Sequence, residues 1–167
     1  MLPILLIGDT MVISKYCYIT RDFYIDNPNL EKILDVDDCT KHGVRTHLCL
    51  NIKYNQNNIL VPLRKNLGQA DRPFGKIGYS VPSQSKPDAG LDYRYIMIIN
   101  DTKYLKFDKP RISNRQISTI ESSYRTIEKE AIEYIKSYIR VARKNRVERA
   151  ARFRKSSLIN FHKELGI

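Results

Sequence analysis

The chain has 167 residues, which suits one domain with a sizeable core, and its 42% hydrophobic content excludes an intrinsically disordered chain. No stretch approaches the roughly 20 apolar residues of a membrane span, so we expect none. The formal net charge of +11 favours a polyanionic partner, first a nucleic acid and second an acidic membrane surface.

The first residues are expected to be an N-terminal extension. Met11 offers an alternative start, so residues 1–11 are predicted to precede a single domain over residues 12–167. The apolar opening stretch is short, is interrupted by Asp9 and lacks a basic region, which argues against a signal peptide. Neither a disulfide pattern nor a zinc pattern is formed by the three cysteines, Cys17, Cys39 and Cys49. Because cysteines without a disulfide pattern are typical of a reducing compartment, a cytoplasmic location is expected.

The domain is predicted to begin with a strand and short helices. Residues 12–19 are rich in β-branched and aromatic side chains, which favours a strand. Thr20 can cap a short helical turn, and Asn27 with Pro28 can begin a second short helix. The aspartates of residues 35–38 lack the glycine turn and distal glutamate of a calcium loop. A solvated loop is the leading interpretation of these aspartates, and a hard-cation site is the alternative.

An antiparallel sheet is predicted from Leu48 onward. Apolar and polar residues alternate up to an Asn-rich turn, and an apolar run then returns, so residues 48–63 are predicted to form a hairpin. Pro62 cannot donate to a sheet ladder, so the second strand is expected at an edge, or its pairing stops there. Loops are predicted at 66–78 and 82–90. About six strands are expected in all, including 77–81, 93–99 and, returning against 93–99 after a tight turn, 103–107.

The last third of the chain is predicted to be helical. Ser113 and Gln116 have the spacing of a capping box. Apolar residues then recur at spacings of three and four up to Ala142, which predicts one long amphipathic helix, or two with a break at residues 122–123. We expect this apolar stripe to pack on the sheet as core. A last helix is predicted to end before Gly166.

A basic block occupies residues 136–155, with nine Lys and Arg residues against one acidic residue, Glu148. It carries a balance of +8 out of the net +11 of the whole chain. Arginine binds phosphate in a bidentate manner, so we expect this block and two cations of the 66–78 loop to contact RNA. The candidate RNA-binding residues are Lys136, Arg140, Arg143, Lys144, Arg146, Arg149, Arg152, Lys155, Arg72 and Lys76.

A second cationic feature, Arg64-Lys65-Asn66, follows the predicted hairpin. Adjacent cations at the end of a buried strand repel each other unless an anion lies between them, so phosphate is a candidate ligand. The alternative is a solvated basic turn. The chain contains no P-loop, dinucleotide fingerprint, nucleophile elbow or zinc-protease motif, and no cofactor or metal site is expected. The three histidines, His42, His47 and His162, are interpreted as surface or structural residues.

Cleavage of RNA needs no metal. The 2′-OH can attack the adjacent phosphorus once it is in line, and cations stabilise the charge that develops on the phosphorane oxygens. Such a site needs Arg or Lys at the phosphate, a group that moves a proton, and an aromatic or amide group that holds the base. The candidate catalytic residues of this kind are Lys65, Arg64, Tyr24, Arg45 and Asn66.

The order of several short motifs resembles a known family. The motifs are Tyr-Ile-Thr-Arg-Asp-Phe-Tyr (18–24), Val-Pro-Leu-Arg-Lys-Asn (61–66), Gly-Leu-Asp-Tyr (90–93), Glu-Lys-Glu-Ala-Ile-Glu-Tyr-Ile-Lys-Ser-Tyr (128–138) and Leu-Ile-Asn-Phe-His-Lys-Glu-Leu-Gly-Ile (158–167). Over about residues 12–167 the chain resembles the toxins of type III toxin–antitoxin systems, the ToxN/AbiQ superfamily, and most of all its TenpN branch.

The resemblance implies an α+β fold: a compact, barrel-like antiparallel sheet with a long C-terminal helix and flanking short helices, distantly similar to the Kid/MazF toxins. It also implies a metal-independent endoribonuclease that leaves a 2′,3′-cyclic phosphate on cellular or phage RNA. Such toxins are held inactive by a repeated RNA pseudoknot, the antitoxin, in a closed protein–RNA assembly. They act in growth control and in phage defence by abortive infection.

The chain departs from the family at one catalytic position. Where the family has Thr-Ser or Arg-Ser after the Pro-Leu of this strand, the chain has Arg64 and Lys65. Tyr24 matches the family's tyrosine, and Arg45 lies close to the position of its lysine. Lys65 is then expected to clamp the phosphate or donate a proton, or else cleavage is lost while RNA binding stays. The alternative function is a non-catalytic basic module that binds RNA or DNA, and a weaker one is a peripheral protein on an anionic membrane.

Overall fold

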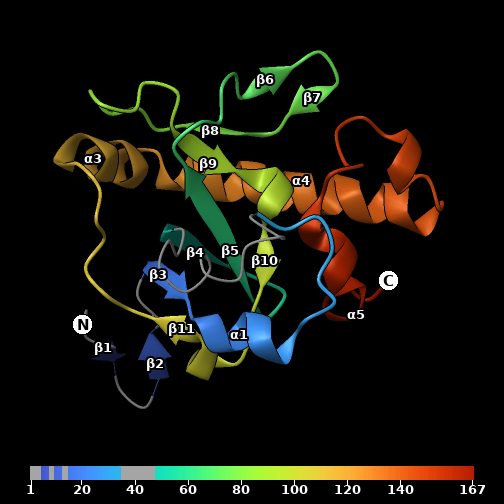
Figure 1. Cartoon of the computed structure of the whole chain (residues 1–167), viewed down its shortest axis with the longest axis horizontal. Helices are drawn as coiled ribbons and strands as arrows, with labels where there is room; N and C mark the ends of the chain where they lie inside the picture. Colours follow the sequence, from blue (N-terminus) through green and yellow to red (C-terminus); the bar gives the residue numbers. More distant parts are fainter. Residues whose placement is uncertain (1–4, 8–9, 13–14, 35–47) are drawn as a thin grey trace.

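A hairpin of two long antiparallel strands lies at the centre of the structure (Figure 1). The computed structural model describes residues 5–7, 10–12, 15–34 and 48–167. Strand β4 (Leu48–Tyr54) pairs with β5 (Asn57–Arg64), which confirms the hairpin predicted over residues 48–63. The turn residues Asn55 and Gln56 have positive φ angles of 46° and 65°, as a two-residue hairpin turn of the mirror-image type requires.

The sheet extends from this hairpin on both sides, and all of its pairs are antiparallel. On one side β4 pairs with β3 (Tyr16–Ile19), which pairs with β11 (Leu105–Lys106). On the other side β5 pairs with β9 (Gly90–Asp92) and β10 (Met97–Ile98), and β9 pairs with β8 (Gly78–Ser80). The predicted antiparallel sheet with helices, one of them long, is thus confirmed, and the described strands do not close into the predicted barrel-like sheet.

Pro62 lies in the middle of the sheet. It is opposite Cys49 in the ladder with β4, while on the other side β5 pairs with β10 at residues 59–60 and with β9 at residues 63–64. The residue without an N–H therefore coincides with a change of partner strand. The expectation that β5 is an edge strand was wrong. The alternative, that pairing stops at Pro62, is confirmed only on the side of β5 that faces β9 and β10.

The region after β9 was predicted as two paired strands and consists instead of short elements. Two 3-10 helices, η1 (Tyr93–Tyr95) and η2 (Thr102–Tyr104), precede β10 and β11. Asp92 begins η1 and Asp101 begins η2, and each side chain accepts a hydrogen bond from the backbone N–H two residues later. Such local bonds offer the backbone an alternative to a ladder. As a result β11 pairs with β3 and not with β10.

Helix α1 (Arg21–Asp26) follows β3 directly, as predicted for the residues after Thr20. The second short helix predicted from Asn27 is wrong, because the described residues 27–34 contain no helix. Asn27 ends α1 instead. Its backbone N–H and its side-chain Nδ2 both donate to the carbonyl oxygen of Phe23, at 3.0 and 2.8 Å.

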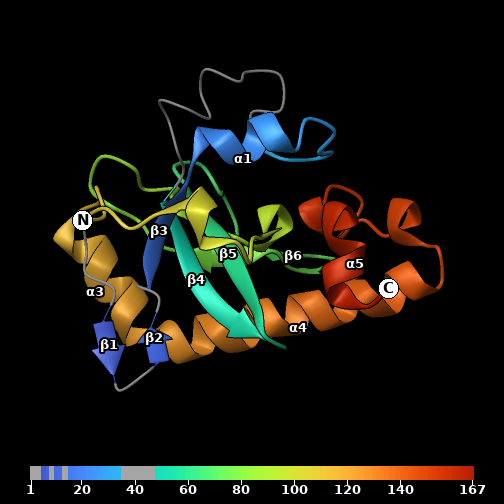
Figure 2. The same ribbon diagram turned by 90° about the horizontal axis from the view of Figure 1, so that it is seen from below.

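Two helices, α3 (Asn114–Ser122) and α4 (Tyr124–Arg143), lie together on one side of the sheet, with α4 running along it (Figure 2). The predicted break between them occurs at Ser123, and the predicted capping box at the start of α3 is present. The apolar stripe of α4 is confirmed as core. Its buried members include Ile127, Ala131, Tyr134, Ile135 and Tyr138.

The remaining elements are short. They are β1 (Leu5–Ile7) paired with β2 (Thr10–Val12), β6 (Asp71–Arg72) paired with β7 (Gly75–Lys76), η3 (Val147–Arg149), η4 (Ser157–Phe161) and α5 (His162–Leu165). The β6–β7 hairpin occupies part of the predicted 66–78 loop. As predicted, the last helix ends before Gly166, which has a left-handed φ of 71°. Among the described residues, no helix is long and apolar enough to cross a membrane.

Candidate functional site

Four of the five predicted catalytic residues are described, and they lie in or next to segments that end at one edge of the sheet. The ladders of β4 with β3 and with β5 bring the end of β3, the start of β4 and the end of β5 to the same edge. Lys65 and Asn66, just after β5, are exposed, and Arg64 is half-buried. Tyr24 is half-buried in α1, which begins at this edge after β3. Arg45 precedes β4 and lies outside the described residues, as do the aspartates of residues 35–38.

The side chain of Arg64 binds a buried carboxylate. Arg64 Nη1 donates to Asp92 Oδ2 at 3.0 Å, and Asp92 is 0% exposed. Arg94 donates to the same carboxylate from Nε and Nη2, at 3.0 and 2.9 Å, and from its backbone N–H at 3.0 Å. One buried carboxylate therefore accepts four hydrogen bonds and holds two guanidinium groups together.

The ring of Tyr95 lies against both guanidinium groups. Their Cζ atoms are 5.0 Å (Arg64) and 5.6 Å (Arg94) from the ring centroid, within cation–π range. The side chains are 28% and 16% exposed, respectively. Within the described residues Arg64 donates no hydrogen bond from its side chain except that to Asp92. Two cations share one anion, so the cluster keeps a partly exposed surplus positive charge, which suits phosphate.

Tyr93, the first residue of η1, anchors a second network. Its buried Oη donates to Glu130 Oε2 at 2.7 Å, and Glu130 Oε1 pairs with Lys76 Nζ at 2.8 Å. Burial and this hydrogen bond raise the pKa of Tyr93 far above its ordinary value, so the phenol stays protonated. The hydrogen bond to Glu130 also raises the pKa of Lys76. The charge of Lys76, predicted to bind RNA, is therefore matched by an internal carboxylate.

Arg152 connects this network to the segment after α4. Its Nε donates to the backbone oxygen of Lys76 at 2.8 Å, and its Nη2 pairs with Glu133 Oε2 at 2.8 Å. Its Cζ lies 5.2 and 5.3 Å from the ring centroids of Tyr134 and Phe153. The hydrogen bond from Arg152 lowers the pKa of Glu133. With only 14% of its side chain exposed, Arg152 holds β7 against the chain that follows α4.

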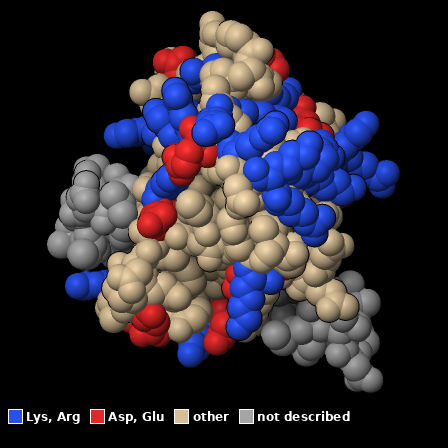
Figure 3. Space-filling model, turned by 90° about the vertical axis from the view of Figure 1, so that its right-hand side faces the viewer, with Lys and Arg blue, Asp and Glu red and all other residues tan. Residues whose placement is uncertain are grey.

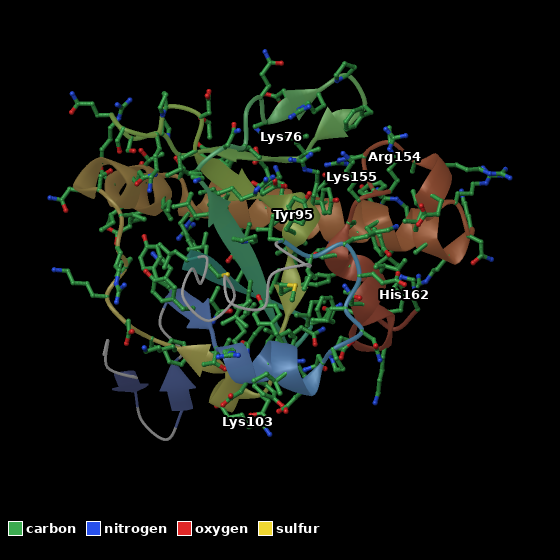
Figure 4. All side chains as sticks on the ribbon, viewed as in Figure 1. Lys76, Tyr95, Lys103, Arg154, Lys155 and His162 are labelled. Carbon is green, nitrogen blue, oxygen red and sulfur yellow. The ribbon has the colours of Figure 1, made fainter. Side chains whose placement is uncertain are left out.

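The segment from Arg152 to Ser157 runs between the two networks. Arg152 binds β7, while Ser157 Oγ donates to backbone oxygens in and directly after η1. The exposed residues between them, Arg154 and Lys155, therefore lie on the way from β7 to η1. Figure 4 shows both on the side of the molecule that carries the labelled residues of β7 and η1. We use the name cationic track for Arg64, Arg94, Lys155, Arg154 and Arg72.

A second group of cations, here the α4 face, lies at the end of α4 and on the turn after it. Its exposed members are Lys136, Arg140, Arg143, Lys144, Arg146 and Arg149. In the part of the chain that the structure describes, none of the six forms an ion pair, and only Arg140 donates a side-chain hydrogen bond, to Ser137 Oγ at 2.8 Å. Figure 3 views this end of the molecule and shows Lys and Arg side chains gathered over its upper half.

The histidine of the described residues has a structural environment. His162 Nε2 lies 2.8 Å from Tyr138 Oη, and the two rings meet edge-on. The other two histidines, His42 and His47, lie outside the described residues. No group of three or more His, Cys, Asp or Glu side chains that could hold a metal ion occurs in the described ranges.

Sequence reasoning did not single out Asp92, Arg94 and Tyr95. A signal for the cluster was present, because Asp92 is an acidic residue at the start of a run predicted to be an apolar strand. A carboxylate in such a run must find cations when it is buried. Arg94 follows two residues later, and Arg64 ends the neighbouring strand.

Comparison of the chain with protein-family models, with curated proteins and with solved structures gave no match.

Proposed function

We propose that this protein is the toxin of a type III, protein–RNA toxin–antitoxin system, similar to the ToxN/AbiQ superfamily and most of all to its TenpN branch. The motif order of the sequence carries the family assignment. The observation that best supports an RNA-directed activity is the clustering of Arg64 and Arg94 on Asp92, with a surplus positive charge beside exposed Lys65. In this proposal the fold, an open sheet with helices, is ToxN-like and distantly similar to that of the Kid/MazF toxins.

The proposed reaction is metal-independent cleavage of RNA at this sheet edge. The 2′-oxygen attacks the adjacent phosphorus as its proton is removed, the bond to the 5′-oxygen breaks, and that oxygen is protonated. The products are a 2′,3′-cyclic phosphate and a 5′-hydroxyl. Arg64 and Lys65 stabilise the charge that develops on the phosphorane oxygens. Asn66 and Tyr24 position the nucleotide, and Arg45 is assigned to the same site by the resemblance alone.

The proposed inhibitor is a structured repeat RNA that binds the protein directly in the cytoplasm. The exposed cations of the α4 face, which form no ion pair within the described residues, support a large phosphate-binding surface separate from the sheet edge. In the proposal a closed assembly of protein and pseudoknot RNA keeps the nuclease inactive. Loss of the RNA during phage infection then releases the toxin, which stops growth.

The test is the substitution Lys65→Ala, with Lys53→Ala as its matched control. Both lysines are exposed, and Lys53 lies at the opposite end of the hairpin, in the part of β4 that leads into its turn. Each variant is expressed in cells without the antitoxin, and growth and the 3′ ends of cellular RNA are followed. We expect Lys65→Ala to remove toxicity and to lower cleavage by about a hundredfold or more, since it loses one transition-state cation. Lys53→Ala should behave as the parent protein.

The RNA that co-purifies with the parent protein completes the test. A short RNA of uniform length that ends in a 2′,3′-cyclic phosphate supports a toxin that trims its own antitoxin. Toxicity that survives Lys65→Ala contradicts the catalytic role of Lys65. RNA that binds without any cyclic-phosphate ends favours the second candidate, a non-catalytic nucleic-acid-binding protein.

That second candidate is favoured by one specific observation. The exposed cations of the α4 face form a surface that needs no catalytic group in order to bind the phosphates of RNA or DNA.

A further inference from the structure

Phe74 is the one exposed aromatic residue of this protein. All eleven Tyr and five Phe residues lie in described ranges, and the others are buried or half-buried. Phe74 is 45% exposed, at the turn of the β6–β7 hairpin, which stands at the outer boundary of the molecule at the top of Figure 1. Phe74 is not part of the hydrophobic core, and its exposed surface contributes no hydrophobic stabilisation.

The hairpin that carries Phe74 is held firmly at its base. Ile77 N donates to the carbonyl oxygen of Ala70 at 2.9 Å, and Arg152 Nε donates to that of Lys76 at 2.8 Å. Gly75, next to Phe74, has a φ of +124°, and a Cβ atom there would lie 3.0 Å from Arg152 Cδ. The positive φ, together with the close approach of Arg152, favours glycine at this position. The aromatic ring is presented by a preorganised turn, which lowers the entropy cost of binding.

Two chain segments bring cations to the hairpin that carries Phe74. Arg72 precedes it by two residues and points its guanidinium at backbone oxygens of Gln69 and Leu67, at 2.8 and 3.5 Å, so no carboxylate matches its charge within the described residues. Arg154 and Lys155 come shortly after Arg152, which donates a hydrogen bond to the backbone of β7, and both are exposed. Phe74 therefore lies on the hairpin that carries Arg72 and that Arg152 joins to the segment of Arg154 and Lys155. Tyr95 lies against Arg64 and Arg94 in the other part of the cationic track.

We propose that Phe74 stacks on an unpaired base of single-stranded RNA whose phosphates follow the cationic track. This inference rests on the proposed function and specifies its ligand as single-stranded rather than duplex RNA. Alternation of cations with aromatic faces is how proteins bind single strands, since phosphates need charge and bases need a flat apolar partner. In a duplex the bases are stacked on each other and offer no face to Phe74.

A protein partner fits the same residues less well. The core of a protein–protein interface is more apolar than the rest of the surface, whereas the neighbours of Phe74 in its hairpin include the charged residues Asp71, Arg72 and Lys76. The net charge of +11 also opposes contact between two copies of this chain. A polyanion with aromatic rings matches both the charge and the side chain.

The absence of tryptophan from the chain allows a direct test. Phe74→Trp introduces a single fluorophore at the turn, and Ile167→Trp introduces one after α5, where Ile167 is 38% exposed. Helix α5 contacts Asn57 at the turn end of the β4–β5 hairpin, away from the proposed site. The probe is a fluorescein-labelled RNA oligonucleotide with 2′-O-methyl sugars, which cannot be cut, as a single strand and as its duplex. Binding is measured by anisotropy for the parent, Phe74→Ala and Phe74→Tyr, and quenching of tryptophan is measured with the unlabelled probe.

We expect the single strand to quench the fluorescence of Phe74→Trp and to leave that of Ile167→Trp unchanged. Phe74→Ala should weaken binding on the order of tenfold, the usual cost of removing one base stack, while Phe74→Tyr binds as the parent does. The dependence of binding on salt should not change, because every cation that binds a phosphate is kept. The duplex should not distinguish Phe74→Ala from the parent.

Three results would overturn the inference. RNA bound equally by Phe74→Ala, without quenching of Phe74→Trp, removes the stacking role and leaves the proposed function standing. A change in oligomeric state of Phe74→Ala with unaltered RNA affinity assigns the residue to a protein contact. If neither the parent protein nor any variant binds the probe, both the stacking role of Phe74 and the proposed function are rejected. If RNA quenches the tryptophan of Phe74→Trp but the parent protein shows neither toxicity nor RNA cleavage, the stacking role is supported and only the nuclease activity is rejected.

Discussion

Arg64, the last residue of β5, donates a hydrogen bond to the buried carboxylate of Asp92, which lies 28 residues later in the chain. This bond ties the end of the central strand to the start of η1, and Arg94 completes the arrangement by gripping the same carboxylate through its side chain and its backbone. The buried carboxylate of Asp92 therefore fixes the positions of the two positive charges at the edge of the sheet. Asp92 orients the two guanidinium groups and keeps them from repelling each other.

Asp92→Asn should destabilise the protein strongly. The amide is similar in size but carries no charge, so two partly buried guanidinium groups would lose their common partner. We expect the free energy of unfolding to fall by about 3–5 kcal/mol, the usual effect of breaking a buried ion pair. Urea denaturation followed by circular dichroism measures the change.

Asp88→Asn is the matched control for this substitution, because Asp88 is an exposed aspartate close to the same strand and its side chain makes no ion pair within the described residues. Its free energy of unfolding should change by less than about 0.5 kcal/mol. If Asp92→Asn were as stable as this control, the carboxylate would not be the group that holds the two arginines in place.

Neutralising the α4 face should reduce the dependence of RNA binding on salt. The variant replaces Arg140, Arg143, Arg146 and Arg149 by Gln. For every phosphate that the variant no longer neutralises, the slope of log affinity against log salt concentration should fall by about 0.7 for a single strand or 0.9 for a duplex. Binding at several salt concentrations measures this slope.

A control variant that replaces four exposed lysines elsewhere, Lys53, Lys86, Lys103 and Lys109, by Gln separates a specific surface from the general effect of net charge. We expect its slope to match that of the parent protein. Equal slopes for the parent and the arginine variant would mean that RNA binds on another surface.

Tyr16 and Tyr138 are among the tyrosines that should ionise late when the pH is raised. Burial, followed by the charge of Glu121, raises the pKa of Tyr16 to about 12, and burial, followed by the charge of Glu148, raises that of Tyr138 to about 12. A raised pKa means that the folded state favours the protonated phenol. The resulting stability is fully present below pH about 10, the ordinary pKa, and is lost as the pH rises through 12.

Near-ultraviolet absorbance of tyrosinate during an alkaline titration measures this behaviour. Tyr138→Phe and Tyr16→Phe should each remove part of the absorbance change that occurs near pH 12 and leave the earlier part unchanged. Ionisation of either phenol at pH about 10, with the protein still folded, would show that its environment is not the buried one described here.

Much of the fold follows from local pattern. Alternation of apolar and polar residues predicts the β4–β5 hairpin, and the spacing of apolar residues predicts α4 with its break before Tyr124. Several of the wrong predictions fall where side chains bind the backbone locally. Asn27 is used to end α1, and Asp92 and Asp101 each begin a 3-10 turn where continuous strands were expected. The pattern of apolar residues carries no information about these bonds.

The central hairpin, the core face of α4 and the overall excess of positive charge can be predicted from the sequence, because they depend on residue type and on spacing between neighbours in the chain. Which of the charges remain unmatched depends on tertiary packing. Lys76 and Arg152 are paired with Glu130 and Glu133, whereas Arg64 and Arg94 share one carboxylate. Most of these pairings join residues far apart in the chain, so the electrostatics of the site arise from packing and not from local sequence.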